Sequence, residues 1–301
     1  MPKRYRELFL GYAAQFGLFV GRMMPRRLGL VLFSFLGMSF YYISYRERNR
    51  TLHHLRFIYG QEWSERKIKT VAVQVFKNSG KNLFDAVNLG TFNEEKLDKV
   101  VSTDSLDEFK QAYDKGKGVI GIVAHVGCFE MLLHFFSLKG MKSFAIGRKF
   151  KNAKVDEVVR AMRSGPDIEY MDRSENSRKV IRFLQQGRVM GALIDQDTKV
   201  EGVFADFLGK TAFTPSGPMH LAMKFNIPVF VVTTARMSGD KHHVFVSEQL
   251  SLDDTGNFEA DLVSNVQKAN DIISGAIRKN PEQWVWMHKR WATKPESVMQ
   301  K

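Results

Sequence analysis

The sequence predicts an α/β protein in which helices flank a mainly parallel β-sheet. From residue 118 onward, short β-branched and apolar runs alternate with stretches of helical periodicity, which is typical of a parallel sheet covered on both faces. Hydrophobic residues make up 44% of the 301 residues, which allows a sizeable core and excludes a disordered chain. The single cysteine excludes an internal disulfide framework and suits a reducing compartment.

The net charge of +13 is concentrated near the N-terminus. Residues 1–60 contain ten Lys or Arg side chains and two Glu side chains, a net charge of +8. Two apolar runs, 8–21 and 28–45, lie between the basic clusters. Basic clusters around Leu, Phe and Tyr indicate contact with anionic membrane lipid. A nucleic-acid-binding arm would interleave its charges with polar residues, so no nucleic acid partner is expected.

The second apolar run is at the short limit for crossing a bilayer. An 18-residue helix reaches about 27 Å, whereas the hydrocarbon core is about 30 Å thick. We predict an N-terminal membrane-anchoring helical segment over residues 1–60 and one catalytic domain over residues 61–301, held on the cytoplasmic face. The alternative is a hydrophobic helical hairpin packed on that domain.

The elements of the domain follow from periodicity and turn residues. Apolar residues at helical spacing predict an amphipathic helix over 65–89. The predicted strands are 118–124, 143–146, 168–171, 189–194, 228–234 and 243–246. The remaining predicted helices are 130–138, 155–162, 174–186 and 218–225, and a loop is predicted over 203–209. No linker rich in proline or glycine divides residues 60–301, so we expect a single catalytic domain.

The first candidate site is the turn after strand 118–124. His125 leaves the strand and Glu130 opens the next helix, so the carboxylate could reach the ring, fix its tautomer and stabilise the imidazolium. No serine or threonine lies within this motif, so the histidine would activate a substrate hydroxyl. The alternative is a strand-end histidine with an unrelated glutamate. Cys128 could be a nucleophile beside His125 or a small apolar residue of a buried turn.

Two further strand ends carry polar side chains. Arg148 follows one strand, and Asp195-Gln196-Asp197 follows another. The two aspartates could bind a metal ion or cap the following turn, but no second His/Asp cluster at ligand spacing supports a metal site. Because parallel sheets place their chemistry at the carboxyl ends of strands, we predict that His125, Arg148 and Asp195 surround one cleft.

Four motifs in a fixed order carry a family resemblance. They are His125–Glu130, Arg148, Asp195-Gln196-Asp197 followed by Thr214, and a Trp-x-His-x-Arg ending from Trp286 to Arg290. Together they resemble the lauroyl/myristoyl acyltransferase family of lipid A biosynthesis, within the wider glycerolipid acyltransferase group, from about residue 10 to Trp291. His54-Leu55 stands where this family usually has Asn-Leu, and Leu208 replaces a second aromatic residue.

The resemblance implies a membrane-associated O-acyltransferase of the bacterial inner membrane. It would move a fatty acyl chain from acyl carrier protein or coenzyme A to a hydroxyl of a glycolipid, most simply a lipid A precursor, without a metal or redox cofactor. His125 would be the general base and Glu130 its orienting acid. The implied substrate-binding residues are Arg148, Asp195, Gln196, Asp197, Thr214 and Arg290. A lysophospholipid or another glycolipid as acceptor, or water in a thioesterase, are the alternatives.

Overall fold

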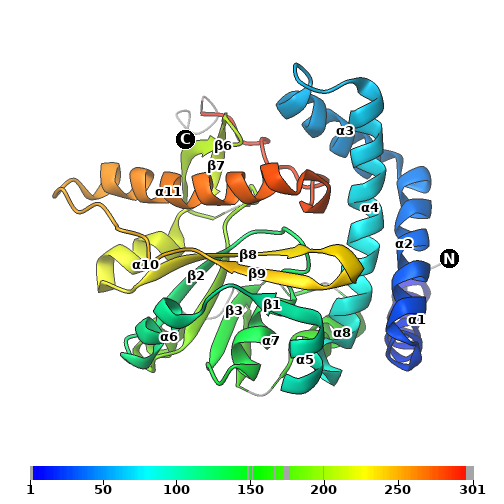
Figure 1. The fold of residues 1–301 in the computed structure, drawn as a ribbon, viewed down its shortest axis with the longest axis horizontal. Helices are drawn as coiled ribbons and strands as arrows, with labels where there is room; N and C mark the ends of the chain where they lie inside the picture. The colour runs from blue at the N-terminus through cyan, green and yellow to red at the C-terminus, as the bar shows by residue number, and fades with distance from the viewer. Residues whose placement is uncertain are drawn as a thin grey trace.

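The computed structural model describes residues 3–147, 149–150, 152–165, 167–172, 177–198 and 200–295. In this part of the chain, a seven-stranded sheet has the order β1-β9-β8-β2-β5-β3-β4 (Figure 1). The strands are β1 (Val101–Thr103), β2 (Val119–Val123), β3 (Ser143–Gly147), β4 (Ile168–Asp172), β5 (Val189–Leu193), β8 (Val229–Arg236) and β9 (His242–Val246). Only the pairing of β8 with β9 is antiparallel among these described strands. The prediction of a mainly parallel α/β sheet is confirmed.

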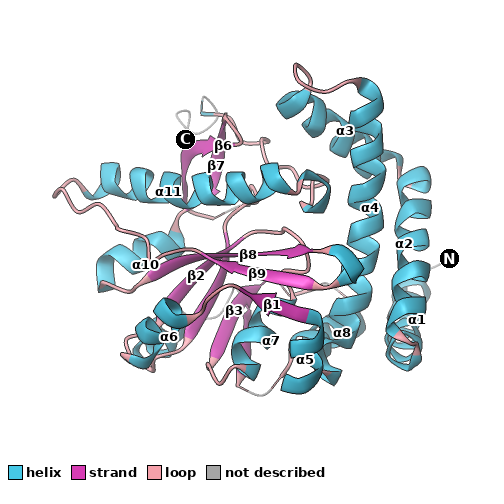
Figure 2. Ribbon diagram, in the orientation of Figure 1, coloured by secondary structure: helices cyan, strands magenta, loops and turns pink. Residues whose placement is uncertain are grey.

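Helices cover both faces of the sheet (Figure 2). Because side chains alternate along a strand, Ile120 and Ile122 of β2 face one core and Val119 and Val123 face another. The first core is covered by α4 (Glu65–Asn88), α9 (Ser177–Gln185), α10 (Gly217–Phe225) and α11 (Phe258–Lys279), and the second by α5 (Glu94–Val100), α6 (Asp107–Asp114) and α7 (Met131–Leu138). A further helix, α8 (Ala153–Arg163), follows β3.

The prediction of a loop over 203–209 is wrong. This segment forms a two-stranded antiparallel hairpin of β6 (Gly202–Phe207) and β7 (Lys210–Pro215). Leu208 and Gly209 connect the strands with φ angles of 55° and 80°, and two consecutive residues at positive φ suit the twist of a tight hairpin. The hairpin packs against α11, a helix for which the sequence analysis made no prediction.

The N-terminal residues form three helices, α1 (Lys3–Met23), α2 (Arg26–Ile43) and α3 (Tyr45–Tyr59). No single helix in the described ranges combines the length and hydropathy needed to cross a membrane, although α2 and α3 do so as a pair bent by 90°. The predicted membrane-anchoring helix is therefore not supported as a span. Instead, α2 packs along α4 (Figure 1), much as in the alternative of a packed hairpin.

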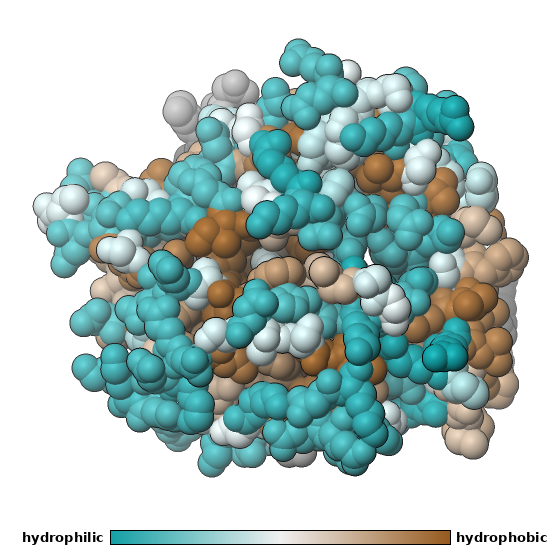
Figure 3. Space-filling view, in the orientation of Figure 1, coloured by the Kyte–Doolittle hydropathy of each residue, from teal (hydrophilic) through white to brown (hydrophobic). Residues whose placement is uncertain are grey.

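Glycines bring α2 and α4 into close contact. A Cβ atom on Gly37 would lie 2.1 Å from the carbonyl oxygen of Phe76, and one on Gly80 would lie 2.0 Å from that of Phe33. The opposite side of α2 is exposed: Val31 and Phe35 are 68% and 57% exposed. Figure 3 shows hydrophobic side chains gathered at the edge of the molecule where α1 and α2 lie.

The close packing of α2 on α4 predicts the effect of one methyl group. Gly37→Ala should lower the free energy of unfolding by about 1–3 kcal/mol, because the new Cβ overlaps a backbone oxygen that cannot rotate away. Gly17→Ala on α1 is the matched control, since nothing lies within 4 Å of its Cβ position. Denaturant unfolding measures both variants, and equal stability of the two would contradict the packing.

Candidate active site

The site forms where the carboxyl ends of β2 and β5 lie side by side. The two strands pair in parallel with Val123 opposite Leu193, so the residues two positions further on, His125 and Asp195, also meet. The Nδ1 atom of His125 lies 2.7 Å from Oδ1 of Asp195. The backbone N–H of His125 donates to Oδ2 over 2.7 Å, and Trp284 Nε1–H donates to the same oxygen over 2.7 Å.

These contacts determine the charge of Asp195 and the tautomer of His125. Burial by itself would raise the pKa of Asp195, but the interactions with His125 and Trp284 outweigh it and lower the pKa to about 2. The charged carboxylate accepts the Nδ1–H of His125, so Nε2 is the nitrogen available for proton transfer. The side-chain nitrogen of Gln196 lies 2.8 Å from that Nε2 atom.

The predicted contact between His125 and Glu130 is not made in this structure. Both carboxylate oxygens of Glu130 instead face Arg163, with 2.8 Å between Oε2 and the arginine Nε. Arg163 also donates to the hydroxyl of Tyr170. The physical reason is that Asp195 already occupies Nδ1 of His125, whereas the guanidinium of Arg163 offers Glu130 two parallel donors.

The other predicted site residues have different positions. Arg148 lies outside the described residues, so its place in the predicted cleft stays a prediction. Asp197 accepts hydrogen bonds from the backbone and the hydroxyl of Thr293, at 2.6 and 2.9 Å, and thus holds the C-terminal segment. No group of three or more His, Cys, Asp or Glu side chains among the described residues could hold a metal ion.

Thr214 and Arg290 lie side by side and are hydrogen-bonded to each other. Arg290 donates to the Thr214 hydroxyl over 2.7 Å, and its guanidinium carbon lies 4.3 Å from the ring centre of Phe207. Both side chains have 0% exposure, and burial lowers the pKa of Arg290 to about 10. In this structure they join the β6–β7 hairpin to the C-terminal segment, and their role in substrate binding stays a prediction.

The sequence analysis did not assign a role to His288, which lies in the site. Its ring centre is 5.2 Å from that of His125. Burial, and to a smaller extent the nearby His125, lower the pKa of His288 to about 4, so His288 is neutral at physiological pH. Its place in the Trp-x-His-x-Arg motif was the signal that could have identified it.

The turn after His125 leads into the N-terminus of α7. Gly127 has a φ angle of 57°, and its N–H donates to the carbonyl of Gln283 over 3.0 Å. The backbone N–H groups of Cys128, Phe129 and Glu130 donate no hydrogen bond within the described ranges. The Cys128 thiol is buried, and burial raises its pKa, which disfavours the thiolate that a nucleophile needs.

An apolar cavity of about 270 Å³ begins at this turn. Phe129 and Glu130 line it from the turn, and Arg163 and Tyr170 contribute polar groups. Gly121 and Gly191, which are register partners on β2 and β5, line its sheet side. Hydrophobic side chains of α7 complete the wall: Leu132, Leu133 and Phe136.

The buried histidines predict an acid-sensitive fold. Burial lowers the pKa of His54 and of His288 from 6.5 to about 4, so the unfolded chain binds more protons between these values and stability falls as the pH drops from about 7 to about 4. His54→Asn should flatten this fall, because it removes one of the two titrating rings. The asparagine amide can still donate to the Trp286 carbonyl, which Nδ1 of His54 contacts at 2.8 Å.

Denaturant unfolding at pH 7 and at pH 5 measures this dependence. The exposed neighbour His53 provides the control. Burial is the main cause of the lowered pKa of His54 and His53 is a smaller one, so His53→Asn should change the pH dependence much less. Equal flattening by the two substitutions would contradict the assignment to His54.

Comparisons with known proteins identify the family of the chain. The model of the bacterial lipid A biosynthesis acyltransferase family matches residues 2–293. The chain is 22% identical to the lipid A biosynthesis palmitoleoyltransferase of Escherichia coli over 245 residues, which is 80% of this chain and 78% of that protein. It is also 22% identical to the lipid A biosynthesis lauroyltransferase of the same organism over 261 residues, 84% of this chain and 82% of that one.

A crystal structure of a 1-acyl-sn-glycerophosphate acyltransferase from Thermotoga maritima matches with a TM-score of 0.40 and 12% identity, covering 85% of this chain and 99% of that one. The family match extends over almost the whole chain and includes His125, Asp195 and the C-terminal tryptophan segment. The chain therefore belongs to the bacterial lipid A biosynthesis acyltransferase family, which confirms the resemblance seen in the sequence and the prediction of an O-acyltransferase.

Proposed function

We propose that the protein transfers a fatty acyl group from an acyl thioester, on acyl carrier protein or coenzyme A, to a hydroxyl of a lipid A precursor. One observation carries the proposal: Nδ1 of His125 is held by a buried carboxylate while its Nε2 faces the site, next to an apolar cavity. The relatives in Escherichia coli are named for acyl transfer in lipid A biosynthesis. Both donor carriers are anionic, which suits a net charge of +13.

In the proposed reaction one proton passes from the acceptor hydroxyl to His125 and then to the leaving thiolate. Nε2 of His125 takes the proton of the acceptor hydroxyl as its oxygen bonds to the thioester carbon, and the carbonyl oxygen becomes an oxyanion. The negative Asp195 stabilises the imidazolium that forms. The intermediate then collapses, the carbon–sulfur bond breaks, and the thiolate takes the proton from Nε2. The step balances without a metal or redox cofactor.

The oxyanion requires hydrogen-bond donors near His125. The N–H groups of Cys128, Phe129 and Glu130 just before α7, which have no acceptor among the described residues, would supply these donors, and the N-terminal end of a helix favours negative charge. Gly127 is not a member of this set, because its N–H is bound to the carbonyl of Gln283. Gln196 occupies the position where the acceptor oxygen would approach Nε2, so it would move aside when the acceptor binds.

The apolar cavity would hold the hydrocarbon part of the donor. Phe129 lines it and also lies 4.5 Å from the His125 ring, measured between ring centres. An acyl chain in this cavity would therefore have its thioester end near the dyad. On this view Glu130 acts with Arg163 at the polar part of the cavity wall and does not orient His125.

The exposed face of α2 would contact the inner membrane, with the site on the cytoplasmic side. The apolar side chains on this face, including Val31 and Phe35, are exposed. The basic residues Arg27, in the first turn of α2, and Arg46, at the start of α3, are also exposed. A helix with an apolar outer face and basic ends suits a position in the interface of an anionic membrane. This arrangement would bring a membrane-bound glycolipid acceptor to the enzyme.

Purified protein with an acyl thioester and a lipid A precursor tests the reaction. His125→Ala should lower single-turnover transfer at saturating donor by about 10²-fold or more, and Asp195→Asn by a similar order. The double variant should be scarcely worse than His125→Ala, because the carboxylate acts only through the ring. Asp261→Asn is the matched control and should lose far less, since this buried carboxylate accepts hydrogen bonds from the backbone and hydroxyl of Thr255 and does not contact the dyad.

Two results would contradict the assignment. One is thioester hydrolysis that no glycolipid acceptor diverts into transfer, which would indicate a thioesterase. The other concerns the transfer rates of two double variants. If the losses of His125→Ala and Asp195→Asn multiply, whereas a double variant of His125 and Glu130 is scarcely worse than His125→Ala, then Glu130 is the orienting acid.

Membrane contact is tested by sedimentation with vesicles that contain anionic lipid. The double substitution Val31→Glu and Phe35→Glu places two like charges on the outer face of α2 and should release most of the protein into the supernatant. Val263→Glu with Ile272→Glu makes the same change on α11, where these side chains are 39% and 37% exposed, and should leave binding unchanged. Equal binding of both double variants would contradict the assignment to α2.

A further inference from the structure

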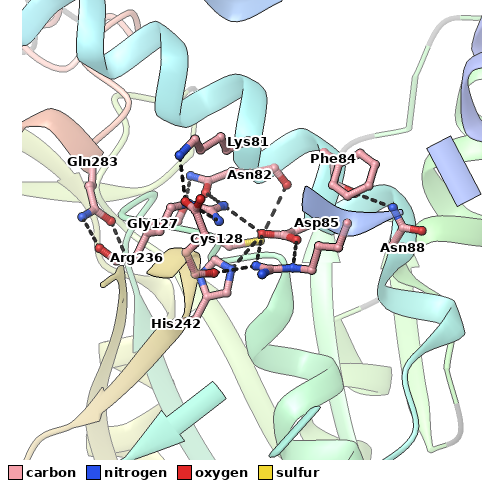
Figure 4. A network of polar contacts seen from close by, with 12 residues as sticks. Lys81, Asn82, Phe84, Asp85, Asn88, Gly127, Cys128, Arg236, His242 and Gln283 are labelled. Carbon is pink, nitrogen blue, oxygen red and sulfur yellow. Dashed lines mark hydrogen bonds and ion pairs between the residues drawn. The ribbon is translucent and has the colours of Figure 1, made fainter. Parts of the chain in front are cut away.

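A buried polar network lies behind the catalytic turn, on the side of α4 (Figure 4). Arg236, at the end of β8, is its centre. The backbone of Arg236 forms two hydrogen bonds with the side chain of Gln283, at 2.6 and 2.9 Å. Its guanidinium donates to Oδ1 of Asn82 on α4 over 2.6 Å.

Both partners of Arg236 hold the same residue of the turn. The side-chain nitrogen of Asn82 donates to the carbonyl of Gly127 over 2.8 Å, and the carbonyl of Gln283 accepts the N–H of Gly127 at 3.0 Å. Gly127 is therefore fixed at its N–H and at its C=O. The position requires glycine, because a Cβ atom there would lie 2.3 Å from the carbonyl oxygen of Thr234.

The side chain of Arg236 is fixed in turn by a buried carboxylate. Asp85 is 1% exposed and lies 2.9 Å from the guanidinium of Arg236, from that of Arg26 and from Nε2 of His242. Replacing buried ion pairs by apolar residues often stabilises a protein, so such a network is weak evidence for stability. Here it holds the guanidinium that orients the Asn82 side chain, and thereby the hydrogen bond from Asn82 to the turn.

The hydrogen bond from Asn82 has a consequence for the next peptide group. A trans peptide is planar, and its C=O and N–H point in opposite directions. The carbonyl of Gly127 faces α4, so the N–H of Cys128 faces away from α4. This N–H is the first of the three that donate no hydrogen bond in the described part of the chain.

We propose that Asn82 is a positioning residue for acyl transfer: by holding the Gly127 carbonyl, it aims the Cys128 N–H at the oxyanion of the tetrahedral intermediate. The inference rests on the proposed acyltransferase reaction and deepens it. Asn82 does not contact the substrates in this role. It contributes to the transition state through the orientation of one backbone donor, and Arg236 keeps its amide in the required direction.

Asn82→Asp tests the inference with a nearly isosteric change. A carboxylate can still accept from Arg236, but it cannot donate to the Gly127 carbonyl and repels it. We expect kcat to fall about 10- to 100-fold, below the 10²–10³-fold typical of deleting an oxyanion donor outright, with KM for donor and acceptor changed less than about twofold. The pH dependence of kcat should keep its midpoint, because His125 and Asp195 are untouched.

Asn88→Asp is the matched control on the same helix. The side chain of Asn88 is also half-buried and donates to a backbone carbonyl, that of Phe84, over 2.9 Å. This substitution removes the same kind of hydrogen bond without contact to the turn, so kcat should stay within about twofold of the original. Asn82→Ala is the second test variant, since it deletes the donor without adding a charge to the network.

The outcomes separate this inference from the reaction on which it rests. Loss of kcat in both Asn82 variants with unchanged KM, and none in Asn88→Asp at equal thermal stability, would support it. Equal losses in Asn82→Asp and Asn88→Asp, or a loss that appears only in KM, would overturn it while acyl transfer stands. Absence of acyl transfer by the unsubstituted protein would overturn the proposed function and this inference with it.

Discussion

The arrangement of the site depends on the hydrogen bonds that the carboxylate of Asp195 accepts. It is fully buried, and a buried charge is tolerated only when hydrogen bonds replace the water it has lost. Three N–H groups do so: the backbone and ring of His125 and the indole of Trp284. One side chain therefore joins the ends of β2 and β5 to the C-terminal segment and sets the tautomer of the histidine.

The segment from Gln283 to Arg290 depends on the N-terminal helices as well as on Asp195. Nδ1 of His54 on α3 contacts the carbonyl of Trp286, and Arg50 donates to that of Met287 over 2.9 Å. The first and last parts of the chain are thus held together beside the site.

Contacts of α4 connect α2, the candidate membrane-binding helix, to the turn after His125. Arg26 on α2 binds Asp85 on α4, and Asn82 one turn earlier on α4 binds Gly127. Glycine contacts keep α2 and α4 closely packed. A continuous set of contacts therefore runs from α2 through Asp85, Arg236 and Asn82 to Gly127 in the turn after His125.

Local patterns in the sequence determined much of this protein. They predicted the amphipathic helix α4, the exit of His125 from a buried strand, and the strands and helices between residues 118 and 246 apart from the β6–β7 hairpin. They also indicated an exposed apolar and basic N-terminal region. Only the tertiary structure decided that β2 and β5 are neighbours, which gives His125 a partner 70 residues away in place of the nearby Glu130. It also decided that α2 packs on α4, and that Thr214 and Arg290 bind each other. The physical reason is that periodicity reports which face of an element is buried, whereas strand order and register, set by packing over the whole chain, determine which side chains meet.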